Sequence, residues 1–319
     1  MDVLVTGGAG FIGAHLCRAL RGASEGGRLI VLDNLSTGIA SNLAGVADVD
    51  VVVGSVLDQR LVDKLVSQCE AVVHLAAIPA VARSLDDPRA THDVNVTGTL
   101  EVLDAARAHG TYVIVASSSS VYGRGASLPT SEDHPTRPAS PYAASKLAAE
   151  SYALSYGRSF GLRVLALRFF NVFGPLQRAD HAYAAVIPAF VAAAVSGQPL
   201  LVHGDGTQTR DFTYVGDVSA VLAEAVARGV TSDLPVNLAF GSNTSLLALI
   251  EELEAAVNRP LAREFGPIRS GDVHDSRANS ARLRSLFPAV RPTSLRDGLA
   301  ATVDWFRGDA LRPTIAAAR

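Results

Sequence analysis

The first half of the chain alternates short apolar runs with longer segments whose apolar residues recur at helical spacing. The apolar runs fall at residues 2–6, 28–33, 49–53, 71–75, 112–116 and 163–168. The segments with helical spacing fall at residues 11–20, 61–66, 94–106 and 143–160. Strands that are apolar on both faces and alternate with helices are typical of a parallel sheet covered by helices on both sides. The alternation therefore predicts an α/β fold with a doubly wound parallel sheet.

The second half of the chain loses this strict alternation, because Gly and Pro interrupt it more often after about residue 171. Segments near residues 211–240 have the pattern of a helix followed by a strand, and we expect them to return to the first sheet. The pattern predicts a larger sheet domain over residues 1–171 and a smaller, mixed C-terminal region over residues 172–319 whose loops cover the open edge of the sheet. Further helices are expected at residues 245–257 and 295–306.

Composition excludes several classes of protein. Of the 319 residues, 48% are hydrophobic and 18% are charged, which allows a substantial core, and a net charge of −3 provides no basic face for nucleic acid. No apolar stretch is long enough to span a membrane, and the first strand begins too near Met1 for a signal peptide. The only two cysteines, Cys17 and Cys69, rule out a disulfide framework and favour a cytoplasmic location. We predict no metal site, no nucleic-acid partner and no membrane association.

A glycine-rich loop follows the first predicted strand and opens the first predicted helix. Gly7, Gly10 and Gly13 are spaced to make a tight turn, to let the backbone approach a pyrophosphate and to let the helix pack close to the sheet. The N-terminus of the helix adds partial positive charge for the phosphates. Asp33 ends the second predicted strand, where a carboxylate binds an adenosine ribose hydroxyl and repels a 2′-phosphate. Together these residues predict a Rossmann dinucleotide site that prefers NAD over NADP.

Tyr142 and Lys146 lie four residues apart in a predicted helix, so they share one helical face. Ser140 and Pro141 precede them as a cap and a first-turn residue. A nearby ammonium favours a phenolate, so we expect Lys146 to lower the pKa of Tyr142 and make it a base for a hydroxyl proton. Lys64 is the only other lysine, and arginine cannot replace lysine as a titratable cation. A surface Tyr–Lys pair on a solvated helix face is the alternative interpretation.

Four serines, residues 117–120, follow the strand predicted at residues 112–116. Ligands bind at the carboxyl ends of strands in an open parallel sheet, so these hydroxyls are candidates for contact with a reacting alcohol. Serine-rich loops are otherwise commonplace, and at most one or two of these hydroxyls can face a single site.

These features together resemble the extended short-chain dehydrogenase/reductase family, whose motif positions are matched by Gly7, Gly10, Gly13, Ser118, Tyr142 and Lys146. Six further segments resemble its nucleotide-sugar branch: residues 74–77 (HLAA), 95–99 (NVTGT), 168–174 (RFFNVFG), 204–212 (GDGTQTRDF), 237–239 (NLA) and 269–272 (RSGD). The resemblance extends over about residues 2–300 and is strongest to UDP-hexose 4-epimerases. It implies an NAD-dependent isomerase whose partner is a UDP-sugar substrate.

The resemblance also implies roles for individual residues. Ser118 would hold the sugar 4-hydroxyl, Tyr142 would act as acid and base, and Lys146 would bind the nicotinamide ribose. The NAD site would be formed by Gly7, Gly10, Phe11, Ile12, Gly13, Asp33, Asn34, Ser36, Thr37, Ser55, Val56, Leu75, Ala76, Ala77, Asn95, Tyr142 and Lys146. The UDP-sugar would contact Ser118, Ser119, Ser120, Tyr142, Asn171, Arg178, Val186, Arg210, Arg269 and Asp272. Ser55 departs from the family pattern, because an aspartate that binds adenine usually stands there.

The residues after Ser118 indicate the type of reaction. Related enzymes that dehydrate nucleotide sugars have Asp-Glu at this point, whereas this chain has Ser119 and Ser120. Serine at its ordinary pKa cannot replace these carboxyl groups, so elimination is disfavoured. The remaining reaction is epimerisation at C4, in which Tyr142 takes the hydroxyl proton, NAD takes a hydride, and the hydride returns to the other face of a transient 4-keto sugar. A 4-ketoreductase and a catalytically idle NAD-binding sensor are the alternatives.

Two positions bear on the identity of the sugar. Arg178 lies where UDP-glucuronate 4-epimerases place an arginine for the C6 carboxylate, whereas the small Ser276 would leave room for a 2-acetamido group. We expect the UDP-glucuronate/UDP-galacturonate pair to be preferred, with UDP-glucose/UDP-galactose as further substrates and UDP-N-acetylglucosamine as the alternative. Members of the family commonly pair through the helices at residues 94–106 and 142–153, so a homodimer is expected.

Overall fold

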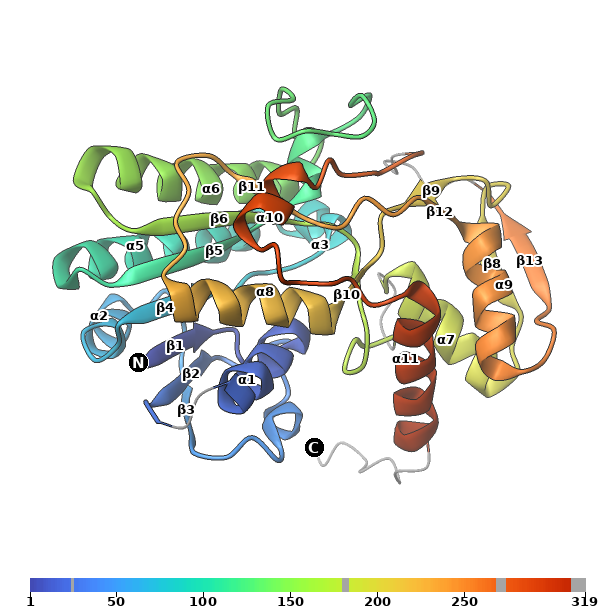
Figure 1. The fold of residues 1–319 in the computed structure, drawn as a ribbon, viewed down its shortest axis with the longest axis horizontal. Helices are drawn as coiled ribbons and strands as arrows, with labels where there is room; N and C mark the ends of the chain where they lie inside the picture. Colours follow the sequence, from blue (N-terminus) through green and yellow to red (C-terminus); the bar gives the residue numbers. More distant parts are fainter. Residues whose placement is uncertain (24–25, 180–183, 268–273, 311–319) are drawn as a thin grey trace.

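The computed structural model describes residues 1–23, 26–179, 184–267 and 274–310. Its largest sheet has seven strands that pair in parallel, in the order β11-β6-β5-β4-β1-β2-β3 (Figure 1). The strands are β1 (Val3–Thr6), β2 (Leu29–Asp33), β3 (Val49–Val53), β4 (Ala71–His74), β5 (Tyr112–Ser118), β6 (Val164–Phe169) and β11 (Val236–Leu238). The order reverses at β1, which lies between β2 and β4, so the predicted doubly wound Rossmann sheet is confirmed.

Helices cover both faces of this sheet. One face carries α1 (Phe11–Ala23) and α8 (Val215–Arg228), and the other carries α2 (Gln59–Val66), α5 (Gly98–His109) and α6 (Pro141–Phe160) (Figure 1). Successive side chains of a strand point to opposite faces. In β1, Val3 and Val5 therefore join the core that includes α8, whereas Leu4 joins the core that includes α2 and α5. Each fully buried aliphatic side chain contributes roughly 1.5–3 kcal/mol, so these two cores hold the three layers together.

The carboxyl edge of the sheet carries several short helical segments. They are η1 (Ala40–Leu43), α3 (Val81–Asp86), α4 (Pro88–His92), a π-helical turn η2 (Asp93–Thr97) and η3 (Ser119–Tyr122). The single helix expected at residues 94–106 is therefore divided into η2 and α5. The Thr99 hydroxyl donates to the carbonyl oxygen of Asn95, at 2.7 Å, and side-chain bonds of this kind distort regular helices.

A smaller region follows with a core of its own. Its helices are α7 (Val186–Ser196), α9 (Leu246–Val257) and α11 (Leu295–Ala310), and its strands β8 (Leu200–His203) and β13 (Arg263–Gly266) pair in parallel. Phe190, Leu249 and Leu299 are buried at the contact among the three helices. Two-stranded pairs join this region to the sheet domain: β7 (Val172–Phe173) with β10 (Thr213–Tyr214), and β9 (Thr209–Arg210) with β12 (Thr244–Ser245).

The chain crosses between these two parts more than once. As expected for residues 211–240, α8 packs against α1 and β11 extends the sheet beside β6. The short helix α10 (Ala281–Leu286) then lies against β11 before α11 returns to the smaller region. We propose that the boundary at residue 171 separates the first domain from the substrate-binding region.

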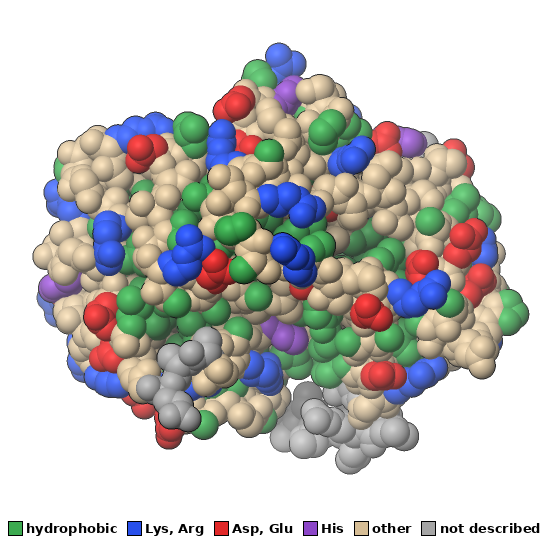
Figure 2. Space-filling view, viewed as in Figure 1, with side chains coloured by type: hydrophobic (Ala, Val, Ile, Leu, Met, Phe, Trp, Pro, Cys, Tyr) green, Lys and Arg blue, Asp and Glu red, His purple; other side chains and the backbone are tan. Residues whose placement is uncertain are grey.

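The surface seen in Figure 2 intersperses acidic and basic side chains rather than gathering basic ones into a single field. Over the described part of the chain, no helix is both long and apolar enough to cross a membrane. The same residues contain no group of three or more His, Cys, Asp or Glu side chains that could hold a metal ion.

Candidate active site

The glycine-rich loop between β1 and α1 leaves no space for a side chain at Gly7 or at Gly13. Gly7 has a φ of +71°, and a Cβ added there would lie 2.8 Å from the backbone nitrogen of Ala76. A Cβ added at Gly13 would lie 2.4 Å from the carbonyl oxygen of Gly7. The loop therefore presents bare backbone at the N-terminus of α1, which is the arrangement that binds a pyrophosphate. The chain thus fits a dinucleotide at the place that the sequence predicted.

Asp33 lies at the end of β2 beside this loop and is only 8% exposed. Its two carboxylate oxygens accept hydrogen bonds from the backbone N–H groups of Ala9, at 3.0 Å, and Leu35, at 2.9 Å. These bonds fix the carboxylate against the glycine loop, while each oxygen keeps a further lone pair for a ribose hydroxyl. The binding of ribose by Asp33 stays a prediction.

The other predicted NAD-binding residues lie in two neighbouring loops. Asn34 accepts a bond from the backbone of Ser36, at 3.1 Å, and the Ser55 hydroxyl accepts one from the backbone of Leu57, at 3.1 Å. Val56 is buried. The contacts of the remaining members with NAD stay predictions: Gly10, Phe11, Ile12, Thr37, Leu75, Ala77 and Asn95.

The three predicted catalytic residues meet at the carboxyl ends of β5 and β6. Ser140 caps α6 by accepting a bond from the backbone of Ala143, at 3.1 Å, so Tyr142 lies in the first turn of the helix. The Tyr142 hydroxyl lies close enough to the Ser118 side chain for the two to interact. Lys146 is buried one turn further, and its Nζ donates to the carbonyl oxygen of Ala116, at 3.0 Å. The structure thus brings Ser118, Tyr142 and Lys146 together.

Burial dominates the electrostatics of this group. It raises the pKa of Tyr142 above its ordinary value, and the interaction with Ser118 opposes that rise. Burial also lowers the pKa of Lys146 to about 8. The expectation that Lys146 lowers the pKa of Tyr142 is therefore wrong for this structure. Desolvation of the phenol raises this pKa by more than Ser118 lowers it, and the Lys146 ammonium is directed to Ala116.

Ser120 determines where the Ser118 proton can go. The Ser118 oxygen accepts a bond from the backbone N–H of Ser120, at 3.2 Å, and another from the Ser120 hydroxyl, at 2.9 Å. With both acceptor positions used, the single Ser118 proton is available to Tyr142 or to a substrate oxygen. Ser119 and Ser120 form the first turn of η3 and are partly buried.

A buried ion pair holds the strand and the helix that carry these residues. Glu150 of α6 and Arg168 of β6 are each 3% exposed and are bonded twice, at 2.9 and 2.6 Å. Ser117, next to Ser118, donates to the same carboxylate at 2.6 Å. The Arg168 guanidinium also stacks over the ring of Tyr122, 4.7 Å from its centroid. A buried pair with its hydrogen bonds satisfied fixes geometry, because any displacement would leave a charge unpaired.

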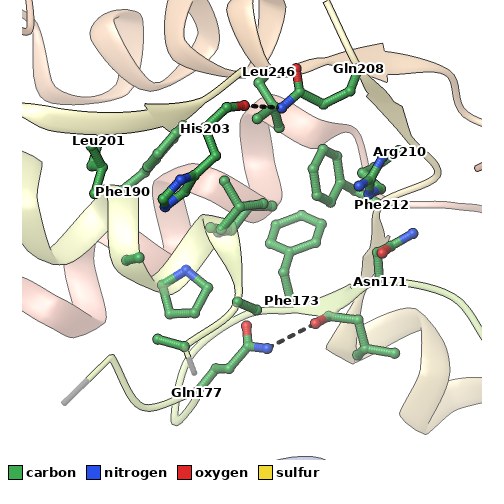
Figure 3. A pocket seen from close by; sticks show the side chains of 17 residues that line it. Asn171, Phe173, Gln177, Phe190, Leu201, His203, Gln208, Arg210, Phe212 and Leu246 are labelled. Carbon is green, nitrogen blue, oxygen red and sulfur yellow. Dashed lines mark hydrogen bonds between the residues drawn. The ribbon is translucent and has the colours of Figure 1, made fainter. Parts of the chain in front are cut away.

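A cavity lies between the segment that follows β6 and the smaller region, and Ser118, Tyr142 and Lys146 are not among the described residues that line it (Figure 3). The pairing of Ser118 with Phe169 places the end of β5 next to the segment that leads to Asn171. Neutral polar, aromatic and aliphatic side chains predominate in its lining, which includes Asn171, Phe173, Gln177, Val186, Phe190, Leu201, His203, Gln208, Arg210, Phe212 and Leu246. Such a mixture of apolar walls and a few polar groups is typical of a small-molecule site.

Gln177 carries an unusual polar atom in this lining. Its Nε2 donates to the carbonyl oxygen of Val172, at 3.0 Å, which fixes the orientation of the amide (Figure 3). Its Oε1 is buried and accepts no hydrogen bond from the described part of the chain. A buried acceptor of this kind is costly, and no donor of the described residues compensates it.

The predicted substrate-binding residues divide into three sets. Asn171, Val186 and Arg210 line the cavity. Arg178 is exposed and is absent from the lining formed by the described residues. Arg269 and Asp272 lie outside the described residues. The contact of Arg178 with a C6 carboxylate stays a prediction.

Sequence reasoning missed several lining residues. Phe173 and Phe212 contact each other edge to face, with ring centroids 6.3 Å apart, and Phe190 projects from α7. Phe173 and Phe212 each lie two residues after a polar residue that was predicted, namely Asn171 and Arg210. That period of two could have indicated extended segments with two side chains on the same face.

The fold and the site define a class of protein: an α/β enzyme that binds a dinucleotide on a glycine loop and carries a Ser–Tyr–Lys group at the adjoining sheet edge. The model of the NAD dependent epimerase/dehydratase family matches residues 3–239. The chain belongs to this family, and its cofactor is NAD.

Known proteins resemble the chain over nearly its whole length. The UDP-glucose 4-epimerase of Mycolicibacterium smegmatis is 38% identical over 96% of this chain and 99% of that protein. A UDP-N-acetylglucosamine 4-epimerase from Methanobrevibacter ruminantium M1, solved with UDP-N-acetylmuramic acid, is 32% identical with a TM-score of 0.91, covering 97% and 98% of the two chains. The UDP-glucuronic acid 4-epimerase of Bacillus cereus, solved with UDP-glucuronic acid and NAD, is 31% identical with a TM-score of 0.86, covering 97% and 99%.

Proposed function

We propose that this chain is an NAD-dependent UDP-sugar 4-epimerase in which Tyr142, Ser118 and Lys146 carry out the proton transfers and orient the reactants. The observation that carries the proposal is the grouping of Tyr142, Ser118 and buried Lys146 at the same carboxyl edge of the sheet that carries the glycine loop. Relatives with 4-epimerase names over nearly the full chain support it.

The chain's own residues account for the acid–base work. Tyr142 takes the proton of the sugar 4-hydroxyl and later returns it to the 4-keto oxygen, while Ser118 keeps its proton and donates a hydrogen bond to the same oxygen. When bound, NAD accepts a hydride from C4 and returns it, and its positive nicotinamide favours the phenolate. Lys146 lies one turn after Tyr142 in α6, where its ammonium can bind a ribose hydroxyl of NAD. The cavity retains the nucleotide while the 4-keto sugar rotates and presents its other face to the nicotinamide.

The residues after Ser118 favour epimerisation over elimination. Ser119 and Ser120 occupy the positions at which a dehydratase would need carboxyl groups, and Ser120 is bonded to Ser118. A 4-ketoreductase remains the alternative within this chemistry. It would consume added NADH in proportion to product, whereas an epimerase leaves the amount of NAD unchanged.

For the sugar, we propose UDP-glucose and UDP-galactose as the principal pair. A relative that is 38% identical over 96% of this chain is named as a UDP-glucose 4-epimerase, and Arg178 is not among the described residues that line the cavity. UDP-glucuronate is the second candidate, because Arg178 has the sequence position expected for a carboxylate-binding arginine. UDP-N-acetylglucosamine is the third, because Ser276 is small.

A panel of the three UDP-sugars, each incubated with the purified protein and saturating NAD, tests this proposal. Proton NMR of the anomeric region distinguishes the 4-epimers in each mixture. We expect UDP-galactose to form fastest from UDP-glucose. Faster conversion of UDP-glucuronate or UDP-N-acetylglucosamine would replace the proposed sugar, and no conversion of any of them would remove the proposed activity.

We also propose that two copies pair through α5 and α6. Phe160 of α6 is 53% exposed and Tyr152 is 42% exposed, and the Arg107 guanidinium of α5 lies 4.7 Å from the Phe160 ring centroid. Large exposed aromatic side chains beside an arginine are enriched at protein interfaces. Light scattering should give twice the chain mass for the wild type and the single mass for Phe160→Glu; a monomeric wild type would contradict this pairing.

A further inference from the structure

A chain of buried hydrogen bonds runs beneath the dinucleotide site and is not explained by the proton transfers above. It involves five side chains that are each at most 4% exposed: Thr6 of β1, His74 of β4, Asn95 of η2, Thr99 of α5 and Ser145 of α6. Burying this many polar groups is unfavourable unless each is bonded, so the arrangement is specific.

The direction of these bonds follows from counting protons. The Thr99 hydroxyl has one proton and donates it to the carbonyl oxygen of Asn95, at 2.7 Å. Thr99 must therefore accept from His74 Nε2, which lies 3.0 Å away, so Nε2 carries the imidazole proton. His74 Nδ1 then accepts from the Thr6 hydroxyl, at 2.8 Å. Burial, together with the charge of Lys146, lowers the pKa of His74 to about 3, which keeps the ring neutral.

The chain continues to the catalytic helix. Asn95 Nδ2 donates to the Ser145 hydroxyl, at 3.0 Å, and that hydroxyl donates to the carbonyl oxygen of Tyr142, at 2.8 Å. The Oδ1 atom of Asn95 accepts a hydrogen bond from the backbone N–H of Ile78, at 2.8 Å. Asn95 thus connects the first turn of α6 with the loop after β4, where Ala76 also meets Gly7.

The other end of the chain reaches the glycine loop. Thr6 immediately precedes Gly7, and its hydroxyl accepts from the backbone N–H of Ala76, at 3.3 Å. The position of the loop that would bind the pyrophosphate is therefore linked to the position of Tyr142 through His74. The π-helical turn at Asp93–Thr97 allows this link, because it places the Asn95 side chain towards α6 and its carbonyl towards Thr99.

We propose that His74 is a positioning residue that couples the placement of the glycine loop to the placement of Tyr142. The inference rests on the proposed epimerase function, since its effect is on the geometry of that reaction. A neutral imidazole suits the role because one ring nitrogen accepts from Thr6 while the other donates to Thr99. Neither an asparagine nor a glutamine side chain reaches both partners.

Two substitutions of His74 separate its two hydrogen bonds, the one with Thr6 and the one with Thr99. In His74→Asn the amide oxygen replaces Nδ1 and keeps the bond from Thr6, but the donor to Thr99 is lost. In His74→Gln the amide nitrogen replaces Nε2 and keeps the donor to Thr99, but the acceptor for Thr6 is lost. We expect His74→Asn to lower kcat about tenfold with little change in NAD affinity, and His74→Gln to weaken NAD binding with little change in kcat at saturating NAD.

Thr99 provides the decisive experiment. Thr99→Val keeps the shape but removes the hydroxyl, and we expect kcat to fall about tenfold while KM for the UDP-sugar and the Kd for NAD stay within about twofold. Thr99→Ser restores the hydroxyl and should return kcat to near the wild-type value. The matched control is Thr302→Val, because the Thr302 hydroxyl is equally buried in α11 and, among the described residues, bonds only the carbonyl oxygen of Gly298, at 2.6 Å. That control should change only the melting temperature.

The outcomes distinguish the inference from the function on which it rests. A wild-type kcat in Thr99→Val, or equal falls in kcat and NAD affinity in both His74 variants, would overturn the coupling. If Thr99→Val does not fold, Thr99→Ser and the two His74 variants decide the question. A wild-type protein that binds NAD but epimerises no UDP-sugar would contradict the proposed function, and the NAD affinities of His74→Asn and His74→Gln would still test the link to the glycine loop.

Discussion

The dinucleotide end and the substrate end of this molecule are built in different ways. The glycine loop comes from one contiguous segment, β1 to α1. Its surface is backbone, because a Cβ on Gly7 or Gly13 would clash with neighbouring backbone atoms. The cavity takes its walls from segments spread over residues 171–246, and its surface consists of side chains. Backbone geometry restricts sequence strongly, whereas a side-chain cavity can change its ligand through few substitutions. The backbone of the glycine loop therefore indicates the cofactor, whereas the side chains of the cavity do not by themselves identify the sugar.

The two ends also differ in how charge is held. Glu150 and Arg168 form a buried pair under the catalytic residues, whereas Glu252 and Arg296 form an exposed pair in the smaller region, at 2.9 Å. We expect Glu150→Gln to lower the free energy of unfolding by about 3–5 kcal/mol, because it leaves the Arg168 charge buried without its partner. Urea denaturation measures the change.

The matched control for that prediction is Glu252→Gln, which should leave the free energy of unfolding unchanged within error. Equal losses in the two variants would contradict the difference between the buried and the exposed pair.

Tyr142→Phe tests the phenol group that we propose as acid and base, between the dinucleotide end and the substrate end. Removal of the phenol oxygen eliminates the proposed acid and base, so turnover should fall at least about 10²-fold, the low end for such a group. The NAD affinity should stay near that of the wild type, because the ring and its packing are retained. Initial rates at saturating UDP-sugar measure the effect, and near-wild-type turnover would remove Tyr142 from the mechanism.

A pair of glycines tests the claim that backbone forms the dinucleotide site. Gly7 and Gly161 have similar φ values, +71° and +69°, but a Cβ at Gly161 meets open space whereas one at Gly7 lies 2.8 Å from Ala76. Both substitutions to alanine carry the strain of a left-handed residue, roughly 1–2 kcal/mol. Only Gly7→Ala should also weaken NAD binding, by about tenfold or more, as measured by calorimetric titration. Equal NAD affinities in the two variants would show that the close approach at Gly7 does not matter for the cofactor.

Two arginines sharpen the comparison at the substrate end. Arg210 lines the cavity and Arg178 is exposed outside it. We expect Arg210→Ala to lower kcat/KM for UDP-glucose by about 10- to 100-fold, the effect of losing a charge-assisted hydrogen bond of roughly 1.5–3 kcal/mol. Arg178→Ala should change kcat/KM less than about twofold for both UDP-glucose and UDP-glucuronate. A selective loss on UDP-glucuronate in Arg178→Ala would instead establish the carboxylate role.

The sequence predicts most of the sheet and little of the cavity. Strands such as Val49–Val53 and helices such as Pro141–Phe160 lie where apolar periodicity and caps place them, because those signals are local. The four-residue spacing of Tyr142 and Lys146 likewise determines their shared face. The direction of the Tyr142 pKa shift could not be predicted, since it depends on burial by distant segments. The π-helical turn before Gly98 and the orientation of Gln177 depend on single tertiary hydrogen bonds, which leave no periodic signal.

Transfer of an isotope label tests the central claim most directly. UDP-glucose that carries deuterium at C4 is incubated with the wild-type protein and catalytic amounts of NAD, and the product is analysed by NMR and mass spectrometry. We predict UDP-galactose that retains the deuterium at C4, because the same hydride leaves and returns within one closed site. Product whose C4 deuterium has been replaced by solvent hydrogen, or the absence of any galacto product, would contradict this account.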